Sequence, residues 1–343
     1  MRVLFVSDYP HLPSIKGGLQ TTTHELCLAI GVAGAEAAVL CGLAEQGAAS
    51  AEPARNDDSL GYRCMRAASP EQALPLVAAD WDASIIVVQS GRSLTSMVLA
   101  SLNTGRATAV YLHNVEIHQL RGMLVPDPTL LYLANSEFTA ERWRALCGLR
   151  CEVIPPVVRA ENYLAAATGS KVLFVNPVPI KGVELMLALA AHCPAIAFLV
   201  VESWNLEPNW RKLCRHRAQA LGNIEWLPPT DNMRAVYAQS QLLLMPSVWE
   251  ESFGRTVIEA QLNGLPVLAS RRGALPQIVG AGGLVLDPHE PVQAWAAALY
   301  RLLAEHDAFS TAARSQALGH CAATPLIVAR LLGLLAEHCA RQA

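Results

Sequence analysis

The stretch from Leu242 to Ala269 constrains the fold of this chain more strongly than any other. It begins with an apolar run, Leu242–Met245, of the length and residue types of a buried parallel strand. A loop with two adjacent glutamates follows, and Gly254 opens a predicted helix that Gly264 closes. A second apolar run begins at Pro266 and predicts the next strand. The order strand, helix, strand is typical of a parallel sheet covered by helices.

The loop and the helix start in this stretch have the composition of a ligand site. Free backbone amides and the macrodipole at the helix start attract a phosphate. Glu251 in the loop and Glu259 in the helix suit hydroxyl groups instead, since an ionised carboxylate can accept two hydrogen bonds from a vicinal diol. A ligand with both phosphates and diols is a sugar nucleotide. The alternatives are an exposed loop acid at Glu251 and a helical ion pair between Arg255 and Glu259.

Composition argues against several other classes of protein. The 343 residues suit two domains, and the 52% of hydrophobic residues can form large cores. A net charge of −3 argues against a nucleic-acid-binding protein, which normally carries a basic surface. The nine cysteines are odd in number and form no C-x-x-C pair, which fits reduced thiols better than disulfides or a zinc site.

The start of the chain and its apolar runs predict the compartment. Strand-like residues begin at Arg2, which leaves no room for a signal peptide. No apolar run of membrane-spanning length is evident. We therefore expect a soluble, cytoplasmic α/β protein.

Apolar runs alternate with helical segments twice along the chain, which predicts two Rossmann-like, doubly wound domains facing a central cleft. We assign residues 1–158 to the first domain, 159–170 to an Ala-rich linker, 171–324 to the second domain and 325–343 to an amphipathic C-terminal helix. The expected strands are Arg2–Val6, Val39–Cys41, Ile85–Val88, Thr108–Leu112 and Leu130–Leu133, and then Lys171–Val175, Ile196–Val201, Ile224–Trp226, Leu242–Met245, Val267–Ala269 and Leu284–Leu286.

Ligands of open α/β sheets bind beyond the carboxyl ends of the strands, and several candidate residues lie there. Gly17 and Gly18 follow the first strand, where they let the backbone approach a sugar or phosphate closely. His113 ends a predicted strand of the first domain. Lys181 lies at a helix start in the second, where a cation indicates a bound anion. The alternatives are an ordinary glycine turn, a structural histidine and a solvated lysine.

Two further patterns carry no function in this interpretation. Asp80-Trp81-Asp82 matches a D-x-D metal motif, but it precedes a strand and so lies at the wrong end of the sheet for a ligand. We expect a helix-to-strand turn there and no metal. The basic clusters at 142–144 and 211–217 suit solvated helix faces, because acidic residues lie close by; contact with anionic membrane lipid is the alternative.

These motifs resemble those of glycosyltransferase family 4, the retaining transferases of GT-B fold that use nucleotide sugars. The most specific is E-x7-E, from Glu251 to Glu259, followed by A-x-x-x-G-x-P-V, and the likeness is strongest from Lys171 to Pro288. The matching pieces are KGG (16–18), YLHN (111–114), LANSEFTAERW (133–143), VIPPVV (153–158), KGVELML (181–187), LMPSVWEESFGRTVIEA (244–260), LNGLPVLAS (262–270), GALPQIV (273–279) and GGLVLDP (282–288).

The resemblance implies three catalytic residues and a glycine loop. Gly17 and Gly18 would lie in the loop facing the donor phosphates. His113 would lie beside the donor sugar at the reaction centre. Lys181 would neutralise the diphosphate leaving group, where negative charge grows in the transition state, and Glu251 would bind hydroxyls of the donor sugar.

The resemblance also implies how the predicted helix start binds the donor. The amides of Phe253, Gly254 and Arg255 would hold sugar or phosphate oxygens, with Ser252 and Thr256 beside them in the donor site. Glu259 would bind the ribose diol. The family implies retention of configuration by front-face displacement without a metal, so no carboxylate acts as a covalent nucleophile. It further implies that the C-terminal helix packs on the first domain.

The chain departs from the family pattern at three places. Asn176 stands in the donor site where most members have an arginine five residues before the lysine, so one positive charge on the diphosphate is missing. Arg255 is a hypothetical substitute for that charge. Glu202-Ser203-Trp204 replaces a glycine-rich turn, and Gln277 replaces a common glutamate.

The sequence therefore predicts a glycosyltransferase that moves a sugar from a nucleoside diphosphate sugar, such as a UDP-sugar or GDP-sugar, to an unidentified glycan, lipid or small metabolite. The donor would bind mainly to the second domain, and no cofactor beyond this donor is expected. One alternative is a sugar-nucleotide epimerase or a phosphorylase on the same fold. Another is a non-catalytic protein that binds sugar nucleotides.

Overall fold

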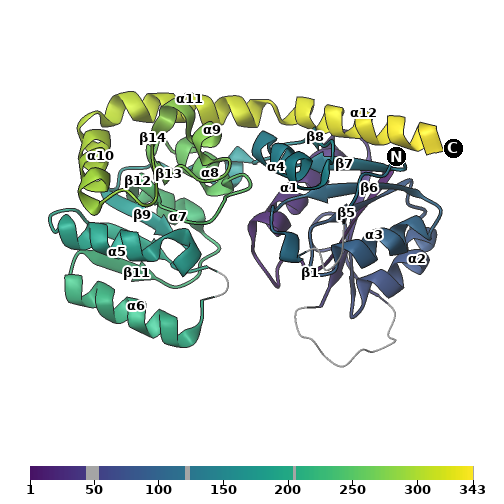
Figure 1. The fold of residues 1–343 in the computed structure, drawn as a ribbon, viewed down its shortest axis with the longest axis horizontal. Helices are drawn as coiled ribbons and strands as arrows, with labels where there is room; N and C mark the ends of the chain where they lie inside the picture. The colour runs from purple at the N-terminus through teal and green to yellow at the C-terminus, as the bar shows by residue number, and fades with distance from the viewer. Residues whose placement is uncertain (44–53, 120–123, 204–205, 343) are drawn as a thin grey trace. The chain divides into compact units, whose positions relative to one another are not determined.

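The computed structural model describes residues 1–43, 54–119, 124–203 and 206–342. They form two α/β units (Figure 1). The first unit consists of residues 1–157 together with 323–343, and the second of residues 158–322. Each unit contains a sheet that is parallel throughout or almost throughout, which confirms the predicted fold class.

The first unit is built on an eight-stranded sheet with the order β3-β4-β2-β1-β5-β6-β7-β8. Its neighbouring strands pair in parallel except β3 and β4, which are antiparallel. The central strands are apolar because helices cover both faces of the sheet. The strands are β1 (Arg2–Pro10), β2 (Glu36–Gly42), β3 (Arg55–Asp57), β4 (Arg63–Ala67), β5 (Ile85–Gln89), β6 (Ala107–Leu112), β7 (Leu130–Ala134) and β8 (Glu152–Val153).

The first strand is longer than the sequence predicts. A loop was expected from Ser7, but β1 continues to Pro10, which pairs with Gly42 after a shift in register. Gly42 permits this late pairing, since a Cβ atom there would lie 2.3 Å from the carbonyl oxygen of Asp8.

Helices lie over both faces of this sheet (Figure 1). One face carries a core that includes Phe5, Leu26 and Leu331, and the other carries a core around Trp81 and Trp143. The helices of the first unit are α1 (Gly18–Val32), α2 (Pro70–Asp80), α3 (Leu94–Leu102), η1 (Ile117–Gln119), α4 (Glu137–Cys147) and α12 (Thr324–Gln342).

The second unit has a six-stranded parallel sheet with the order β11-β10-β9-β12-β13-β14. Each strand predicted from the sequence is present within two residues. The strands are β9 (Lys171–Val175), β10 (Phe198–Val201), β11 (Ile224–Leu227), β12 (Ser240–Met245), β13 (Val267–Ser270) and β14 (Gly283–Leu286). The helices are η2 (Ala160–Asn162), η3 (Pro179–Lys181), α5 (Val183–His192), α6 (Pro208–Leu221), α7 (Met233–Ala238), α8 (Arg255–Leu262), α9 (Leu275–Val279), η4 (Gly280–Gly282), α10 (Val292–Ala304) and α11 (His306–Ala322).

Residues 159–170, predicted to form a linker, lie in the second unit. Tyr163 is buried in its core. Asn263 Nδ2 donates to the carbonyl oxygen of Tyr163 at 3.1 Å, and Asn263 Oδ1 accepts from the amide of Ala165 at 2.7 Å. The Ala-rich composition suggested a linker, but one tyrosine and one distant asparagine anchor the segment to the folded unit.

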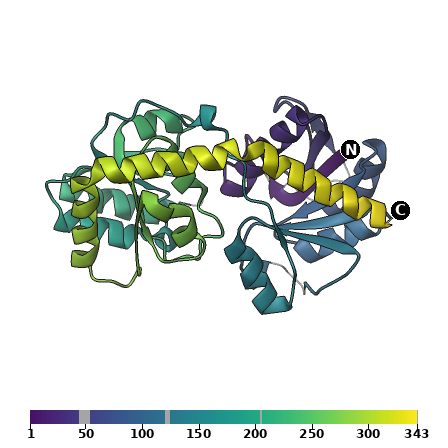
Figure 2. The same cartoon turned by 90° about the horizontal axis from the view of Figure 1, so that it is seen from above.

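The last helix, α12, packs on the first unit. Ile327, Val328, Leu331 and Leu335 are buried in the core that also contains α1, and His338 Nε2 lies 3.0 Å from the carbonyl oxygen of Thr108. Figure 2 shows α12 running over the strands of this unit. The C-terminal helix therefore completes a core that residues 1–157 begin.

One helical segment, His306–Gln342, is long and apolar enough to cross a membrane by length and composition. We expected no such run from the sequence. The segment comprises α11 and α12, and its buried side chains belong to the cores of folded units, with Ala317 in the second and Leu331 in the first. In its most apolar stretch of 18 residues, 22% of the residues are buried.

We predict that Leu331→Ala lowers the free energy of unfolding by about 2–5 kcal/mol, because it removes a fully buried side chain and leaves a cavity. Leu326→Ala is the matched control, since this leucine of the same helix is 74% exposed; its effect should stay within about 0.5 kcal/mol. Urea unfolding followed by circular dichroism measures both. Equal effects would show that α12 does not pack as described.

Candidate active site

Each unit places its candidate residues at the carboxyl edge of its own sheet, where ligands of such folds bind. In the second unit Asn176 directly follows β9, and the loop with Glu251 follows β12. In the first unit His113 directly follows β6, and the glycine pair begins α1.

Lys181 and Glu251 form a close ion pair in the second unit. Lys181 Nζ lies 2.5 Å from Glu251 Oε1, and Ser247 Oγ donates to the same oxygen at 2.7 Å. Glu251 is only 7% exposed and Ser247 is fully buried. Little water therefore screens the attraction between the two charges. The fold thus joins two of the three residues predicted to be catalytic.

Two glycines let the neighbouring loops approach closely enough for this pair. Gly182 has a φ of +82°, and a Cβ atom there would lie 2.0 Å from the carbonyl oxygen of Pro246. Gly273 has a φ of +60°, and a Cβ atom there would lie 2.1 Å from the carbonyl oxygen of Glu251. A left-handed backbone and so close an approach together require glycine at both positions.

Two side chains orient Glu259 inside the second unit. Arg255 Nε lies 2.9 Å from Glu259 Oε1, which is the helical ion pair weighed as an alternative from the sequence. Tyr237 OH donates to Glu259 Oε2 at 2.8 Å. Burial, followed by the charge of Glu259, holds the pKa of Tyr237 well above its usual value, so its hydroxyl remains a donor.

The guanidinium group of Arg255 is engaged within the same unit. Its Nη2 donates to Tyr163 OH at 3.0 Å, and its Cζ lies 5.6 Å from the centre of the Tyr163 ring. Its charge is balanced by Glu259. These contacts give no support to the hypothesis that Arg255 replaces the missing phosphate-binding arginine.

The start of α8 has the form expected of an oxygen-binding helix terminus. Gly254 is its N-cap with a φ of +90°, and glycine has no side chain with which to cap the first amides. Ser252 and Thr256 are half-buried, and Phe253 is buried. The amides predicted to hold sugar or phosphate oxygens therefore lie at a helix terminus that its own N-cap does not satisfy.

Asn176 combines two unfavourable features. Its φ of +65° is left-handed, which asparagine tolerates better than most residues. Its side chain is 4% exposed, and neither Oδ1 nor Nδ2 has a hydrogen-bond partner among the described residues. A buried polar group without a partner costs about 1–3 kcal/mol. The residue that replaces the expected arginine is thus an unsatisfied amide.

His113 is buried at the end of β6 in the first unit. Its Nε2 lies 3.2 Å from Gln89 Nε2, and its ring centre lies 4.1 Å from that of Tyr111. Gln89 Nε2 also donates to Thr23 Oγ1 of α1 at 2.8 Å. Burial lowers the pKa of His113 to about 3, so the imidazole is neutral near pH 7. It can therefore hydrogen-bond a ligand without carrying charge to it.

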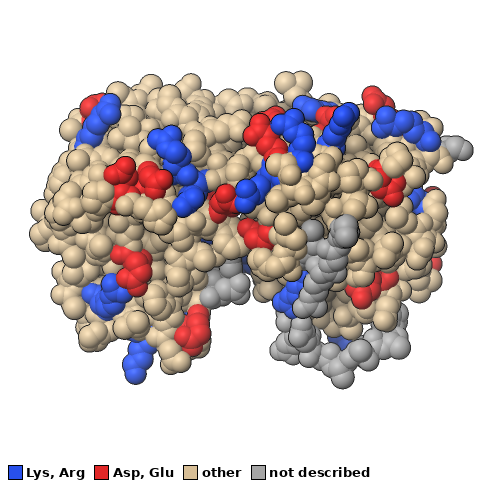
Figure 3. Space-filling model, in the orientation of Figure 1, with Lys and Arg blue, Asp and Glu red and all other residues tan. Residues whose placement is uncertain are grey.

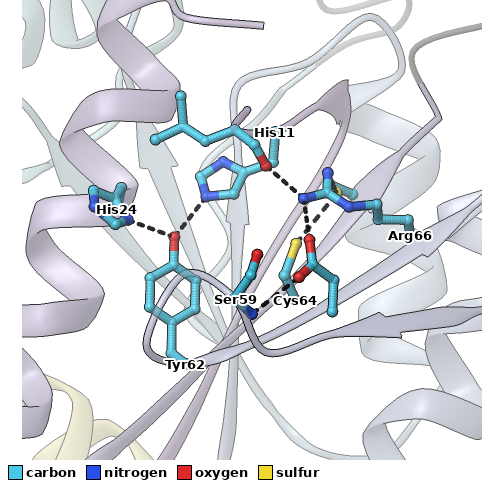
Figure 4. Close-up of polar contacts among 9 residues, drawn as sticks. His11, His24, Ser59, Tyr62, Cys64 and Arg66 are labelled. Carbon is cyan, nitrogen blue, oxygen red and sulfur yellow. Dashed lines mark hydrogen bonds and ion pairs between the residues drawn. The ribbon is translucent and has the colours of Figure 1, made fainter. Parts of the chain in front are cut away.

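Two histidines share one tyrosine hydroxyl near the predicted glycine loop (Figure 4). His11 Nε2 lies 2.7 Å from Tyr62 OH, and His24 Nδ1 lies 3.1 Å from the same oxygen. Burial first, and then the charges of Arg66 and His24, lower the pKa of His11 to about 3. These contacts join the end of β1 to α1 and to the segment before β4.

Arg66 of β4 holds the turn that precedes the glycine pair (Figure 4). Its Nη2 donates to the carbonyl oxygen of Leu12 at 2.5 Å and lies 2.9 Å from Asp57 Oδ2. Gly17 then forms the N-cap of α1, and a Cβ atom at Gly18 would meet no atom within 4 Å. Space around Gly18 is what a backbone needs if a ligand is to approach it closely.

The D-x-D pattern forms the expected turn. α2 ends at Asp80, Trp81 is its C-cap, and Asp82 has a left-handed φ of +49° before β5. Among the described residues no group of three or more histidine, cysteine, aspartate or glutamate side chains could hold a metal ion. The nine cysteines are free thiols, and the Cys41 and Cys64 sulfurs lie 3.8 Å apart.

The second basic cluster is neutralised by neighbouring acids. Arg211 and Arg215 lie 3.0 Å and 2.9 Å from the carboxylate oxygens of Glu202, and Arg217 lies 2.8 Å from Glu184. On the face drawn in Figure 3, basic and acidic side chains are interspersed. Glu202, which stands in place of a glycine-rich turn, is therefore a buried anchor for α6.

Sequence reasoning missed several side chains that touch the candidates. Ser247 lay within the quoted motif, next to Pro246, and a hydroxyl so near Glu251 was a visible signal. Tyr237 and Gln89 lie in stretches without a motif, so no local pattern indicates their contacts with Glu259 and His113.

We predict that Tyr237→Phe lowers the free energy of unfolding by about 1.5–3 kcal/mol, because a buried carboxylate loses a hydrogen bond. Tyr300→Phe is the matched control, since Tyr300 is 50% exposed, and its effect should be within about 0.5 kcal/mol. Denaturant unfolding of the two variants measures the difference. A neutral Tyr237→Phe variant would mean that Glu259 does not depend on this contact.

Buried His113 predicts a loss of stability at low pH. The unfolded chain binds a proton at this ring below about pH 6.5, whereas the folded chain does so only near pH 3, so stability falls as the pH decreases between these values. From pH 6.5 to 4.5 the wild type should lose about 2 kcal/mol more than His113→Gln. Urea titrations at the two pH values measure this, with His289→Gln, an exposed histidine, as control. Parallel losses in wild type and His113→Gln would contradict a neutral buried ring.

Part of the chain matches known sequences. Residues 170–305 match the family model described as Glycosyl transferases group 1. A D-inositol 3-phosphate glycosyltransferase of Corynebacterium glutamicum (strain R) is 44% identical over 96 residues, which are 26% of this chain and 22% of that protein. The protein of the same name from Mycolicibacterium vanbaalenii is 28% identical over 262 residues, 67% of this chain and 56% of that protein. Each match thus spans less than two thirds of the relative's length.

Solved structures resemble almost the whole chain. Sucrose-phosphate synthase from Thermosynechococcus elongatus has a TM-score of 0.79 at 15% identity and covers 98% of this chain and 99% of its own. Anabaena Alr3699/HepE in complex with UDP has a TM-score of 0.73 at 17% identity, and the match covers 97% of this chain and 100% of that one. Such low identities show the fold alone, and the predicted GT-B fold is confirmed. Residues 170–305 therefore match the glycosyl transferases group 1 family, in a chain with the GT-B fold.

Proposed function

We propose that this protein is a family 4 glycosyltransferase that moves a sugar from a nucleoside diphosphate sugar to an acceptor, with retention of configuration and without a metal. The observation that carries the proposal is the Lys181–Glu251 pair, shielded from water at the carboxyl edge of the group 1 domain. A cation and a carboxylate at that edge suit the diphosphate and the sugar of one donor.

Lys181 is proposed to stabilise the leaving diphosphate. An ammonium group has three N–H donors, so Lys181 can keep its contact with Glu251 and still donate to a phosphate oxygen. Negative charge grows on that oxygen as the bond to the sugar breaks, and a positioned cation stabilises it most in the transition state. Glu251, which accepts a hydrogen bond from Ser247, holds the ammonium group in place before the donor arrives.

The remaining candidates are proposed to orient the donor. Glu251 accepts hydrogen bonds from sugar hydroxyls, and Glu259, oriented by Tyr237, accepts from the ribose diol. The first amides of α8 hold oxygens of the sugar or phosphate. His113 is neutral near pH 7, so it contributes a hydrogen bond beside the sugar rather than a proton.

A uridine donor is the first one to test. A solved structure of similar fold, Anabaena Alr3699/HepE, is known with UDP, with UDP and glucose, and with UDP-glucose. The curated relatives are named for transfer to D-inositol 3-phosphate, which makes this compound a first acceptor to test. A thermal-shift panel of UDP, GDP, ADP and dTDP with their common sugars would identify the base. A ligand at one hundred times its Kd stabilises the folded protein by about 2.7 kcal/mol, so the nucleotide that binds raises the Tm.

The decisive experiment follows release of the nucleoside diphosphate with the bound donor. Lys181→Ala and Glu251→Ala should each lower kcat by about 10²–10³-fold, because charge stabilisation at the leaving group is lost. Lys171→Ala is the matched control: Lys171 pairs with Glu225 at 2.5 Å, but it begins β9 and so lies at the opposite end of the strand. Its turnover should equal that of the wild type.

Product analysis separates the proposed reaction from its alternatives. Transfer to an acceptor with retained configuration supports the proposal. An epimerised sugar nucleotide without any acceptor would indicate an epimerase, and a requirement for inorganic phosphate would indicate a phosphorylase. Donor binding without turnover for any acceptor would indicate a non-catalytic binding protein. Unchanged turnover in Glu251→Ala would refute the site assignment.

A further inference from the structure

The side-chain amide of Asn176 differs from that of a structural asparagine in its hydrogen bonding. Both polar atoms of its amide are buried, and neither has a hydrogen-bond partner among the described residues. Asn223 differs, because its Nδ2 donates to three backbone carbonyl oxygens, those of Ala190, Cys193 and Ile196, at 3.0–3.3 Å, and only its Oδ1 is without a partner among the described residues. A buried amide without partners calls for an explanation outside the folded chain.

The backbone of Asn176 points to the same conclusion. Its φ of +65° lies in the left-handed region, which glycine adopts freely and asparagine adopts at a smaller cost than most other residues. In the protein without ligand, Asn176 therefore costs free energy in two ways, through its backbone and through its amide. Unfavourable features of this kind gather at ligand sites, where a bound ligand compensates for them.

Asn176 lies at the start of the loop that carries Lys181. The amide of Val178 donates to the carbonyl oxygen of Asn176 at 2.8 Å, and the amide of Lys181 donates to that of Val178 at 3.0 Å. The amide of Val248, in the loop with Glu251, donates to the carbonyl oxygen of Ile180 at 3.1 Å. Two short turns and one cross-loop hydrogen bond thus connect Asn176 to the Lys181–Glu251 pair.

We propose that Asn176 determines ligand specificity by binding a neutral group of the nucleotide sugar that offers both a donor and an acceptor, and not the diphosphate. The inference rests on the proposed function of this site. A phosphate oxygen only accepts hydrogen bonds, so it would satisfy Nδ2 and leave Oδ1 unpaired. A hydroxyl of the sugar or ribose, or the edge of the base, satisfies both atoms. Lys181 then acts on the diphosphate without a second cation from this position.

The test compares two variants that both remove the amide, of which one relieves the backbone strain and the other keeps it. Asn176→Gly suits the left-handed backbone and should raise the Tm of the free protein by about 2–4 °C. Asn176→Ala keeps the backbone strain, so it should not raise the Tm. Both should weaken binding of UDP-glucose, measured by titration calorimetry, by about tenfold, while binding of inorganic pyrophosphate stays unchanged. Asn223→Ala, the control, should lower the Tm and leave both affinities as in the wild type.

Each outcome decides the inference. If UDP and UDP-glucose both bind more weakly to Asn176→Gly, the neutral group lies on the nucleoside, and if only UDP-glucose does, it lies on the donor sugar. Equal weakening of pyrophosphate and UDP-glucose would overturn the inference in favour of a diphosphate contact. Unchanged affinities in a stabilised Asn176→Gly would overturn it while the proposed function stands. A wild type that binds no nucleotide sugar would overturn both.

Discussion

The close approach of two loops in the second unit is the constraint on which its candidate site depends. Lys181 and Glu251 come from the loops after β9 and β12, and Gly182 lets the first of these loops pass close to the carbonyl oxygen of Pro246 in the second. Gly273, in the loop after β13, likewise lets that loop pass close to the carbonyl oxygen of Glu251. Burying two charges is costly unless each satisfies the other, and Ser247 adds a hydrogen bond to the pair. The chemistry proposed for the site therefore begins with backbone geometry.

The two units hold chemically different groups at their carboxyl edges. The second unit presents charges, with Lys181 and Glu251 paired and Glu259 oriented by Tyr237. The first presents neutral polar groups, because burial keeps His113 uncharged and Gln89 contacts its ring.

Much of the fold was predictable, because apolar runs of strand length alternate with helical segments and the E-x7-E motif lies where a strand passes into a helix. The site was predictable where a motif carried it, as at Lys181 and Glu251. It was not predictable at Tyr163, which turns a segment of linker-like composition into part of the second unit. The burial of the Asn176 amide was not predictable either, because no sequence pattern shows which side chains will lack hydrogen-bond partners.

The sequence by itself determined the order of strands and helices and the residue types that follow each strand. These depend on interactions between near neighbours in the chain, such as hydrogen bonds within a helix and steric limits on φ. Only the tertiary structure decided that Arg255 is bound to Glu259 and Tyr163, that His113 is neutral, and that α12 completes the first core. Those outcomes depend on burial and on partners far along the chain, which local patterns do not record.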